Sequence, residues 1–131
     1  MHYRVSSMFI LIAAAAFGLI SRVMPIGTIV WDKYLGDVVY AVVFYFGLCV
    51  IIGLGRLSSK ICVTTFYVTC IELFQLTPIP LQLNQSSNVL VKVFAYIVLG
   101  STFSWWDLFA YAIGIMFATI VDKTLSAQHA T

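Results

Sequence analysis

Charge is what this sequence has least of. Only 9% of its 131 residues are Asp, Glu, Lys or Arg, whereas 62% are apolar, and typical soluble domains carry about 25% charged residues. Because so few charged side chains could not cover a water-soluble domain of this size, the composition predicts a protein whose solvent is largely lipid. The net charge of +2 is too small and too dispersed to favour a nucleic-acid partner.

Histidine is also scarce, since His2 and His129 lie at the two ends of the chain. Their positions argue against a histidine-ligated zinc or haem, and against a Ser-His-Asp triad, in the membrane-embedded part. The three cysteines, Cys49, Cys62 and Cys70, all fall in apolar runs, so they predict no disulfide framework. We therefore expect no cofactor and no metal site.

Four long apolar runs organise the sequence. The expected membrane spans are residues 6–24, 37–54, 59–76 and 104–121, each close to the ~20 residues that a helix needs to cross a bilayer. A polar tail, 123–131, follows the last run and is expected to be disordered. The predicted fold class is therefore an all-α membrane protein, built as a single multi-pass domain with four transmembrane helices.

Two segments leave an alternative open. Residues 8–20 have the length of the apolar part of a signal peptide, and alanines 14–16 resemble a cleavage site. The apolar run continues past them, so the prediction is a retained helix, with a cleaved signal as the alternative. Residues 89–99 are apolar but reach only about 16 Å as a helix. We expect an interfacial or re-entrant helix there, with a fifth span as the alternative.

Polar residues near the ends of the predicted helices gather at one membrane depth. With four spans, the end of the first and third and the start of the second and fourth face the same side. The residues placed there are Arg22, Asp37, Tyr40, Glu72, Gln75, Asp107 and Tyr111. Asp37 also suits a helix N-terminus, and Ser104 with Asp107 has the spacing of a capping box. Their convergence nevertheless predicts one polar cluster near one membrane face.

Glu72 is the candidate on which this cluster depends most. An acid in a membrane helix is a functional hypothesis by default, because a central charge costs roughly 2.5–3.5 kcal/mol or more to insert. The structural alternative is that Glu72 pairs with Arg22 or bonds to a tyrosine, and so holds the helices together. For Gln75, a hydrogen bond between helices is the favoured role.

Positive residues suggest the orientation of the bundle. Both termini and the second loop hold Arg4, Arg56, Lys60 and Lys123, whereas the other two loops hold Arg22, Lys33 and Lys92. The excess of four over three favours cytoplasmic termini. The polar cluster is then expected in the outer leaflet.

Three motifs occur in an order found in a known family. They are Asp32-Lys33-x-x-Gly36-x-x-x-Tyr40, Glu72-x-x-Gln75 and Phe103-Ser104-Trp105-Trp106-Asp107-x-x-x-Tyr111-x-x-Gly114. The set resembles a bacterial family of small integral membrane proteins known only as a domain of unknown function. More distantly it is similar to the VanZ-like family, whose named member is linked to teicoplanin resistance. The resemblance implies a multi-pass protein of the bacterial inner (plasma) membrane. Gly36 and Tyr111 replace a histidine and an asparagine that are usual in the VanZ-like pattern.

Three classes of function remain open. The prediction is a binding or transport-like module for a small polar, cationic or lipid-headgroup ligand; because four spans enclose little space, a homo-oligomer would aid transport. The first alternative is a structural or accessory subunit whose polar cluster only locks the bundle. The second is an enzyme that uses Glu72 with Asp37 or Asp107 as acid and base, or as ligands for a divalent cation, although no spacing in the sequence requires it. The lipid bilayer is the expected partner in every case.

Overall fold

The computed structural model describes residues 2–53, 55–100 and 102–129. Four helices are long and apolar enough to cross a membrane, which confirms the predicted all-α membrane fold. They are α1 (His2–Val23), η1 with α2 (Val30–Tyr34 and Leu35–Ile52), α3 (Leu57–Phe74) and α6 (Trp105–His129). Leu54, the predicted end of the second span, and residues 130–131 of the predicted tail lie outside the described residues.

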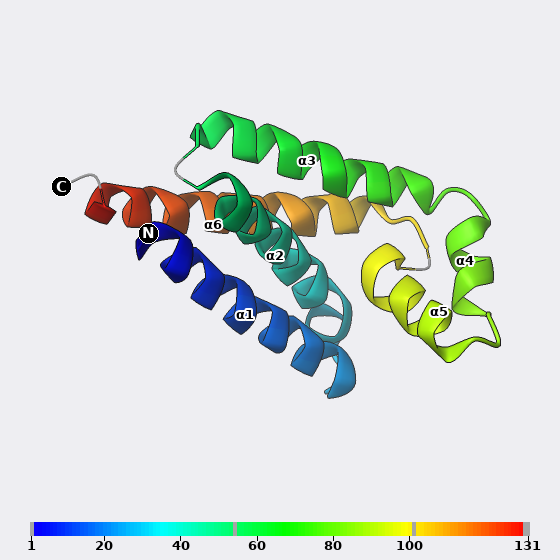
Figure 1. The fold of residues 1–131 in the computed structure, drawn as a ribbon. Helices are drawn as coiled ribbons and strands as arrows, with labels where there is room; N and C mark the ends of the chain where they lie inside the picture. Colours follow the sequence, from blue (N-terminus) through cyan, green and yellow to red (C-terminus); the bar gives the residue numbers. More distant parts are fainter. Residues whose placement is uncertain (1, 54, 101, 130–131) are drawn as a thin grey trace.

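The two chain ends lie at the same end of the bundle, as four spans require (Figure 1). Helix α2 is central, because it contacts α1, α3 and α6. Three short elements, α4 (Ile79–Asn84), α5 (Val89–Phe94) and η2 (Ala95–Leu99), lie at the opposite end (Figure 1). This opposite end is called the outer end below, and the end that holds the termini is called the inner end.

Glycines set the closest contacts between helices. At Gly114 of α6, an added Cβ would lie 2.3 Å from the carbonyl oxygen of Val38 and 3.0 Å from Cβ of Ala41, both in α2. At Gly18 of α1, an added Cβ would lie 2.9 Å from Cγ1 of Val39. Membrane helices associate through such close packing, because lipid tails leave no hydrophobic driving force between them. The glycines therefore fix how closely α1 and α6 approach α2.

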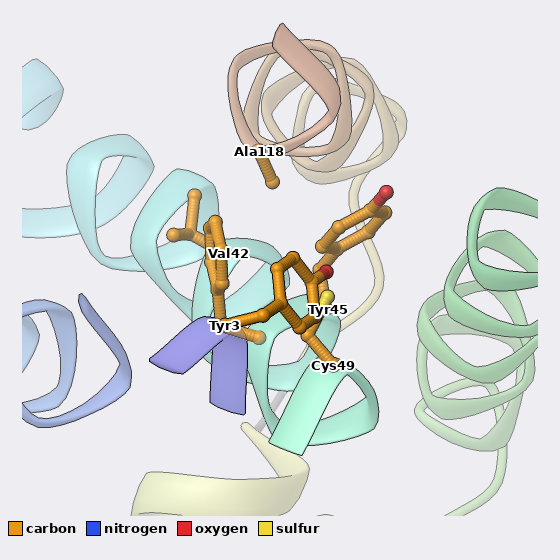
Figure 2. Packing of buried hydrophobic residues seen from close by; sticks show 6 residues of the cluster. Tyr3, Val42, Tyr45, Cys49 and Ala118 are labelled. Carbon is orange, nitrogen blue, oxygen red and sulfur yellow. The ribbon is translucent and has the colours of Figure 1, made fainter. Parts of the chain in front are cut away.

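The largest buried cluster lies toward the inner end. Its members are Tyr3 from α1, Val42, Tyr45, Phe46 and Cys49 from α2, and Ala118 from α6. Figure 2 shows Tyr3, Tyr45 and Ala118 converging from these three helices. A second cluster joins α2 and α6 to α3 through Ala41, Val68, Tyr111 and Ile115. The core thus follows the length of α2.

The start of the second span differs from the prediction. Element η1, expected to be a loop, is a π-helix that runs directly into α2, so the span begins at Val30 rather than at Asp37. The Asp32 carboxylate accepts hydrogen bonds from the backbone N–H groups of Ile26 (2.9 Å) and Gly27 (3.0 Å). These bonds close the preceding turn and allow the helix to start early.

The inner ends of α3 and α6 differ as well. Helix α3 covers 57–74 instead of 59–76, and Lys60, counted above with the second loop, is a buried residue in its first turn. Helix α6 continues to His129, through most of the tail that was expected to be disordered. Its extension is held to α3 by Asp122, which contacts Lys60.

Between α3 and α6 the chain contains more helix than predicted. Residues 89–99 form the expected short apolar helix. Helix α4 was expected to be a loop, but Pro80 lies in its first turn, where proline's missing N–H has no intrahelical partner to lose. The Asn84 side chain donates to the carbonyls of Pro80 (2.9 Å) and Gly100 (2.7 Å), which ties α4 to the end of η2.

Candidate functional site

A cavity of about 250 Å³ lies at the outer end of the bundle. Six of the seven predicted cluster residues line it, namely Arg22, Asp37, Tyr40, Gln75, Asp107 and Tyr111. Asp32, Lys33, Thr102 and the segment 96–100 complete its wall. Residues that are far apart in the sequence therefore surround one space. The short helix η2, with Gly100 after it, forms one side of this space and is called the short-helix wall.

Arg22 links the end of α1 to the wall of this cavity. Its Nη1 atom donates a 2.7 Å hydrogen bond to the carbonyl oxygen of Tyr96, and its guanidinium lies 5.5 Å from the centre of the Tyr96 ring. Its Nη2 atom lies 3.8 Å from Oδ1 of Asp37. Gly36 leaves room for this side chain, because an added Cβ would lie 3.3 Å from Arg22 Nε. Arg22 thus pairs with Asp37 and not with Glu72, the partner that the structural alternative considered.

Asp37 is a buried acid in the wall of the cavity. The residue is 7% exposed, and its Oδ2 atom has no hydrogen-bond partner among the described residues. Because the span begins at Val30, Asp37 lies within a continuous helix and does not cap its first turn. Its one charged contact, to Arg22, is long. The carboxylate therefore retains the capacity to accept a hydrogen bond from a ligand.

Asp107 resembles Asp37 in this respect. It is 4% exposed, and Lys33 Nζ lies 3.2 Å from its Oδ1 atom. The approach lies outside hydrogen-bonding geometry, so within the described part of the chain this oxygen also has no hydrogen-bond partner. The cavity is consequently bordered by two buried acids that each have one oxygen without a hydrogen bond in the described chain, and Lys33 is the ionic partner of the one on Asp107.

Glu72 has a different environment from the other two acids. It is 0% exposed and is not among the residues that line the cavity. Its Oε1 atom accepts a 2.7 Å hydrogen bond from the backbone N–H of Ser104, and Oε2 accepts one of 3.3 Å from Gln75 Nε2. The predicted capping box between Ser104 and Asp107 is therefore wrong, since an acid from α3 takes the Ser104 N–H at the start of α6. The structural alternative expected Arg22 or a tyrosine as the partner of Glu72, and these bonds instead come from Ser104 and Gln75. Gln75, expected to bond to another helix, bonds to a residue of α3 itself.

Tyrosines connect the cavity to its short-helix wall. Tyr40 OH donates to the carbonyl oxygen of Val98 at 3.1 Å, and Tyr67 OH lies 3.0 Å away from it. Because Tyr40 has one hydroxyl proton, Tyr67 is the donor in the second contact. Tyr111 packs beside Tyr40, with 6.2 Å between ring centres, and is 5% exposed. Tyr67 is not among the predicted cluster residues, and no pattern around it in the sequence separates it from other apolar helix residues.

A second polar cluster, which was not predicted from the sequence, lies at the inner end. Lys60 Nζ lies 2.9 Å from Asp122 Oδ2, and both side chains are 1% exposed. Tyr45 OH donates to the same oxygen at 2.8 Å, while Tyr3 OH donates to Oδ1 of Asp122. Lys60 in turn donates to Tyr3 OH at 2.7 Å. One side chain from each of the four spans takes part in this network.

Comparison with known proteins bears on most of the chain. Residues 26–115 match the family described as "Protein of unknown function (DUF2809)". This range contains the three motifs on which the family resemblance rests, from Asp32 to Gly114. No curated protein and no solved structure matches the chain. The more distant likeness to the VanZ-like family has no support beyond the sequence and stays a prediction.

Proposed function

Because the chain belongs to this family, whose description names no activity, we propose its function from the site: the outer cavity binds a small ligand that carries a positively charged amine. One observation carries the proposal. Asp37 Oδ2 and Asp107 Oδ1 are buried oxygens without hydrogen-bond partners in the described chain, and both residues border the same cavity. An unsatisfied buried polar group costs roughly 1–3 kcal/mol, so a donor that reaches Asp37 Oδ2 would remove such a cost. Asp107 Oδ1 already has Lys33 Nζ at 3.2 Å as an ionic partner, and a ligand donor would add a hydrogen bond to it.

The charges and rings of the wall favour a cation over an anion. The lining contains three acids (Asp32, Asp37 and Asp107) against two bases (Arg22 and Lys33), a formal excess of one negative charge. An ammonium group supplies three donors and one positive charge. Tyrosine rings in the wall can also stabilise a cation through their faces. The described residues contain no group of three His, Cys, Asp or Glu suited to a metal ion, which favours an organic cation.

We further infer that the cavity lies at headgroup level in the outer leaflet of a bacterial plasma membrane. Trp105 and Trp106, at the start of α6, are 77% and 67% exposed, and exposed tryptophans favour the membrane interface. The count from the sequence favours cytoplasmic termini by four basic residues to three. Lys60 is buried in α3 and paired with Asp122, so three basic residues remain on each side and the orientation rests on the experiment that follows.

Thiol labelling of intact cells tests this orientation. In a background where Cys62 and Cys70 are replaced by alanine, a membrane-impermeant maleimide should label Ser87→Cys, which lies at the outer end. The same reagent should label Ser58→Cys, at the inner end, only after the cells are permeabilised. The reverse pattern would contradict the orientation.

Thermal unfolding of the purified protein in detergent tests the ligand. Ethanolamine should raise Tm, because a ligand that binds only the folded state stabilises it by mass action, whereas acetate should not. Asp37→Asn and Asp107→Asn should each abolish the ethanolamine effect. Asp32→Asn is the matched control: it removes a charge from the same wall, but the Asp32 carboxylate is already bonded to backbone N–H groups. A Tm shift that survives Asp37→Asn and Asp107→Asn would refute the proposal.

A purely structural role for the cluster is the second candidate. It is favoured by Glu72, whose two oxygens both accept hydrogen bonds within the protein. Oε1 ties α3 to the start of α6 through Ser104 N–H, and Oε2 accepts from Gln75 at the end of α3. On this alternative, Asp37→Asn lowers the Tm of the unliganded protein, and ethanolamine changes the Tm of no variant. The same titration therefore separates the two candidates.

A further inference from the structure

We propose that the ligand is a membrane phospholipid with an amine headgroup, and that one of its acyl chains lies in an apolar groove between α1 and α2. The inference rests on the proposed function and specifies the class of ligand. The groove has a volume of about 260 Å³ and continues from the cavity toward the middle of the bundle. Ala15, Gly18 and Leu19 of α1 form one side of it, and Val39 and Val43 of α2 form the other.

The groove and the polar cavity share part of their walls. Arg22, Tyr40, Ile97 and Val98 line both spaces. The two spaces therefore adjoin at the end of α1, where Arg22 of α1 and Tyr40 of α2 bond to the carbonyl oxygens of Tyr96 and Val98 in η2. From Arg22 to Ala15 the groove follows α1 for seven residues, or about 10 Å. A ligand that fills both spaces must be polar at one end and apolar at the other.

The groove is open to the bilayer from the side. Leu19 and Ile97, in its walls, are 52% and 39% exposed. In a membrane these surfaces face lipid, so a phospholipid can enter without leaving the leaflet. The small side chain of Ala15 contributes little volume to the floor of the groove, whereas Val39 of α2 packs directly against Gly18. A small water-soluble amine has no apolar part that could fill this groove.

Arg22 stands where the phosphate of such a lipid would lie. Its guanidinium lies 3.8 Å from Asp37, and the residue lines both the cavity and the groove. The side chain is 21% exposed, and a guanidinium matches the geometry of phosphate oxygens. The order along the protein is acid, arginine and apolar groove. The order along the lipid is ammonium, phosphate and acyl chain, which is the complementary sequence.

Native mass spectrometry with phosphatidylethanolamine tests the inference. Ala15→Trp should fill the groove and weaken lipid binding by about tenfold, an effect well within the range of one lost apolar contact surface. Ala16→Trp is the matched control, because Ala16 is also exposed and lines neither space. A second pair guards against misfolding: Leu19→Trp fills the groove, whereas Ile20→Trp, at a residue of similar exposure, does not. The increase in Tm caused by ethanolamine should be the same in all four variants.

The outcomes separate this inference from the proposed function. If Ala15→Trp and Leu19→Trp bind phosphatidylethanolamine as the parent does, while ethanolamine still raises Tm, the groove proposal is overturned and the amine site stands. If phosphatidylglycerol of the same chain length binds as tightly as phosphatidylethanolamine, amine selection is overturned. If Asp37→Asn and Asp107→Asn change neither the ethanolamine effect nor lipid binding, the proposed function and the inference both fail.

Discussion

Lys60 of α3 and Asp122 of α6 form an ion pair with 2.9 Å between Nζ and Oδ2, and each side chain is 1% exposed. Tyr45 and Tyr3 donate to the Asp122 carboxylate as well. Burial of an isolated charge is so unfavourable that such a pair persists only when its remaining donors and acceptors are also satisfied. Since the four side chains come from four different spans, the pair fixes the inner end of the bundle.

Breaking this pair from one side should cost more than removing it. Lys60→Met leaves the Asp122 charge buried without its partner, and we expect a loss of about 3–5 kcal/mol in the free energy of unfolding. The double variant Lys60→Met with Asp122→Leu should recover part of that loss. Unfolding curves in detergent measure both. A double variant less stable than either single one would show that the pair stabilises beyond the avoidance of a lone charge.

Two glycines in membrane helices should respond oppositely to alanine. Gly114→Ala places a Cβ 2.3 Å from a backbone oxygen of α2, and overpacking of this kind costs about 1–3 kcal/mol. At Gly47 an added Cβ meets nothing within 4 Å, so Gly47→Ala should stabilise α2 by about 0.5–1 kcal/mol through helix propensity. Thermal unfolding compares the two. If the two substitutions changed the stability equally, the close packing of α6 against α2 at Gly114 would not contribute to stability.

Glu72 should tolerate glutamine better than alanine. Glu72→Ala leaves the Ser104 N–H without its acceptor, at a cost of about 1–3 kcal/mol. Glu72→Gln keeps one carbonyl oxygen for this bond, so its loss of stability should be clearly smaller. Tm and the ethanolamine effect should be measured together on both variants. If Glu72→Gln lost ligand binding while its Tm stayed unchanged, Glu72 would take part in binding the ligand and would not be only structural.

Tyr40→Phe should loosen the short-helix wall of the cavity. The change removes the 3.1 Å hydrogen bond to the Val98 carbonyl, which is worth about 0.5–1.5 kcal/mol. Amide hydrogen exchange should therefore become faster in residues 95–100 and stay unchanged in α6. Phe44→Leu, one turn along α2, is the control for lost aromatic packing. Faster exchange in both variants would trace the effect to packing instead of the hydrogen bond.

The spans and the outer cluster were accessible from the sequence because two strong constraints act there. The length of an apolar run predicts a membrane helix, and successive spans must cross the membrane in opposite directions. These constraints bring Asp37 and Asp107 together without any knowledge of packing. The roles of the acids were less accessible. Ser104 and Asp107 have the spacing of a local capping pattern. In the structure, however, the backbone N–H of Ser104 donates to Glu72, 32 residues earlier. Every residue except proline has a backbone N–H, so the sequence does not indicate which one an acid will bind.

The inner cluster was missed for a different reason. Lys60 and Asp122 each stand beside other polar residues, which made them read as the ends of spans. In the structure α3 starts two residues earlier and α6 continues to His129, which places both residues within helices and turns them inward. A signal was nevertheless present, because the buried residues of α3 recur every fourth position: Lys60, Thr64, Val68 and Glu72. An unbroken stripe of this spacing indicates one inward face, and it includes the lysine.

The wall that η2 contributes to the cavity is anchored through main-chain atoms. Three carbonyl oxygens, those of Tyr96, Val98 and Gly100, accept the bonds that hold it. Every amino acid supplies a carbonyl, so the side chains of this segment can drift in evolution while the anchors persist. The donors Arg22, Tyr40 and Asn84 have no such freedom. Constraint on this side of the cavity is therefore expected to fall on residues outside the segment that forms it.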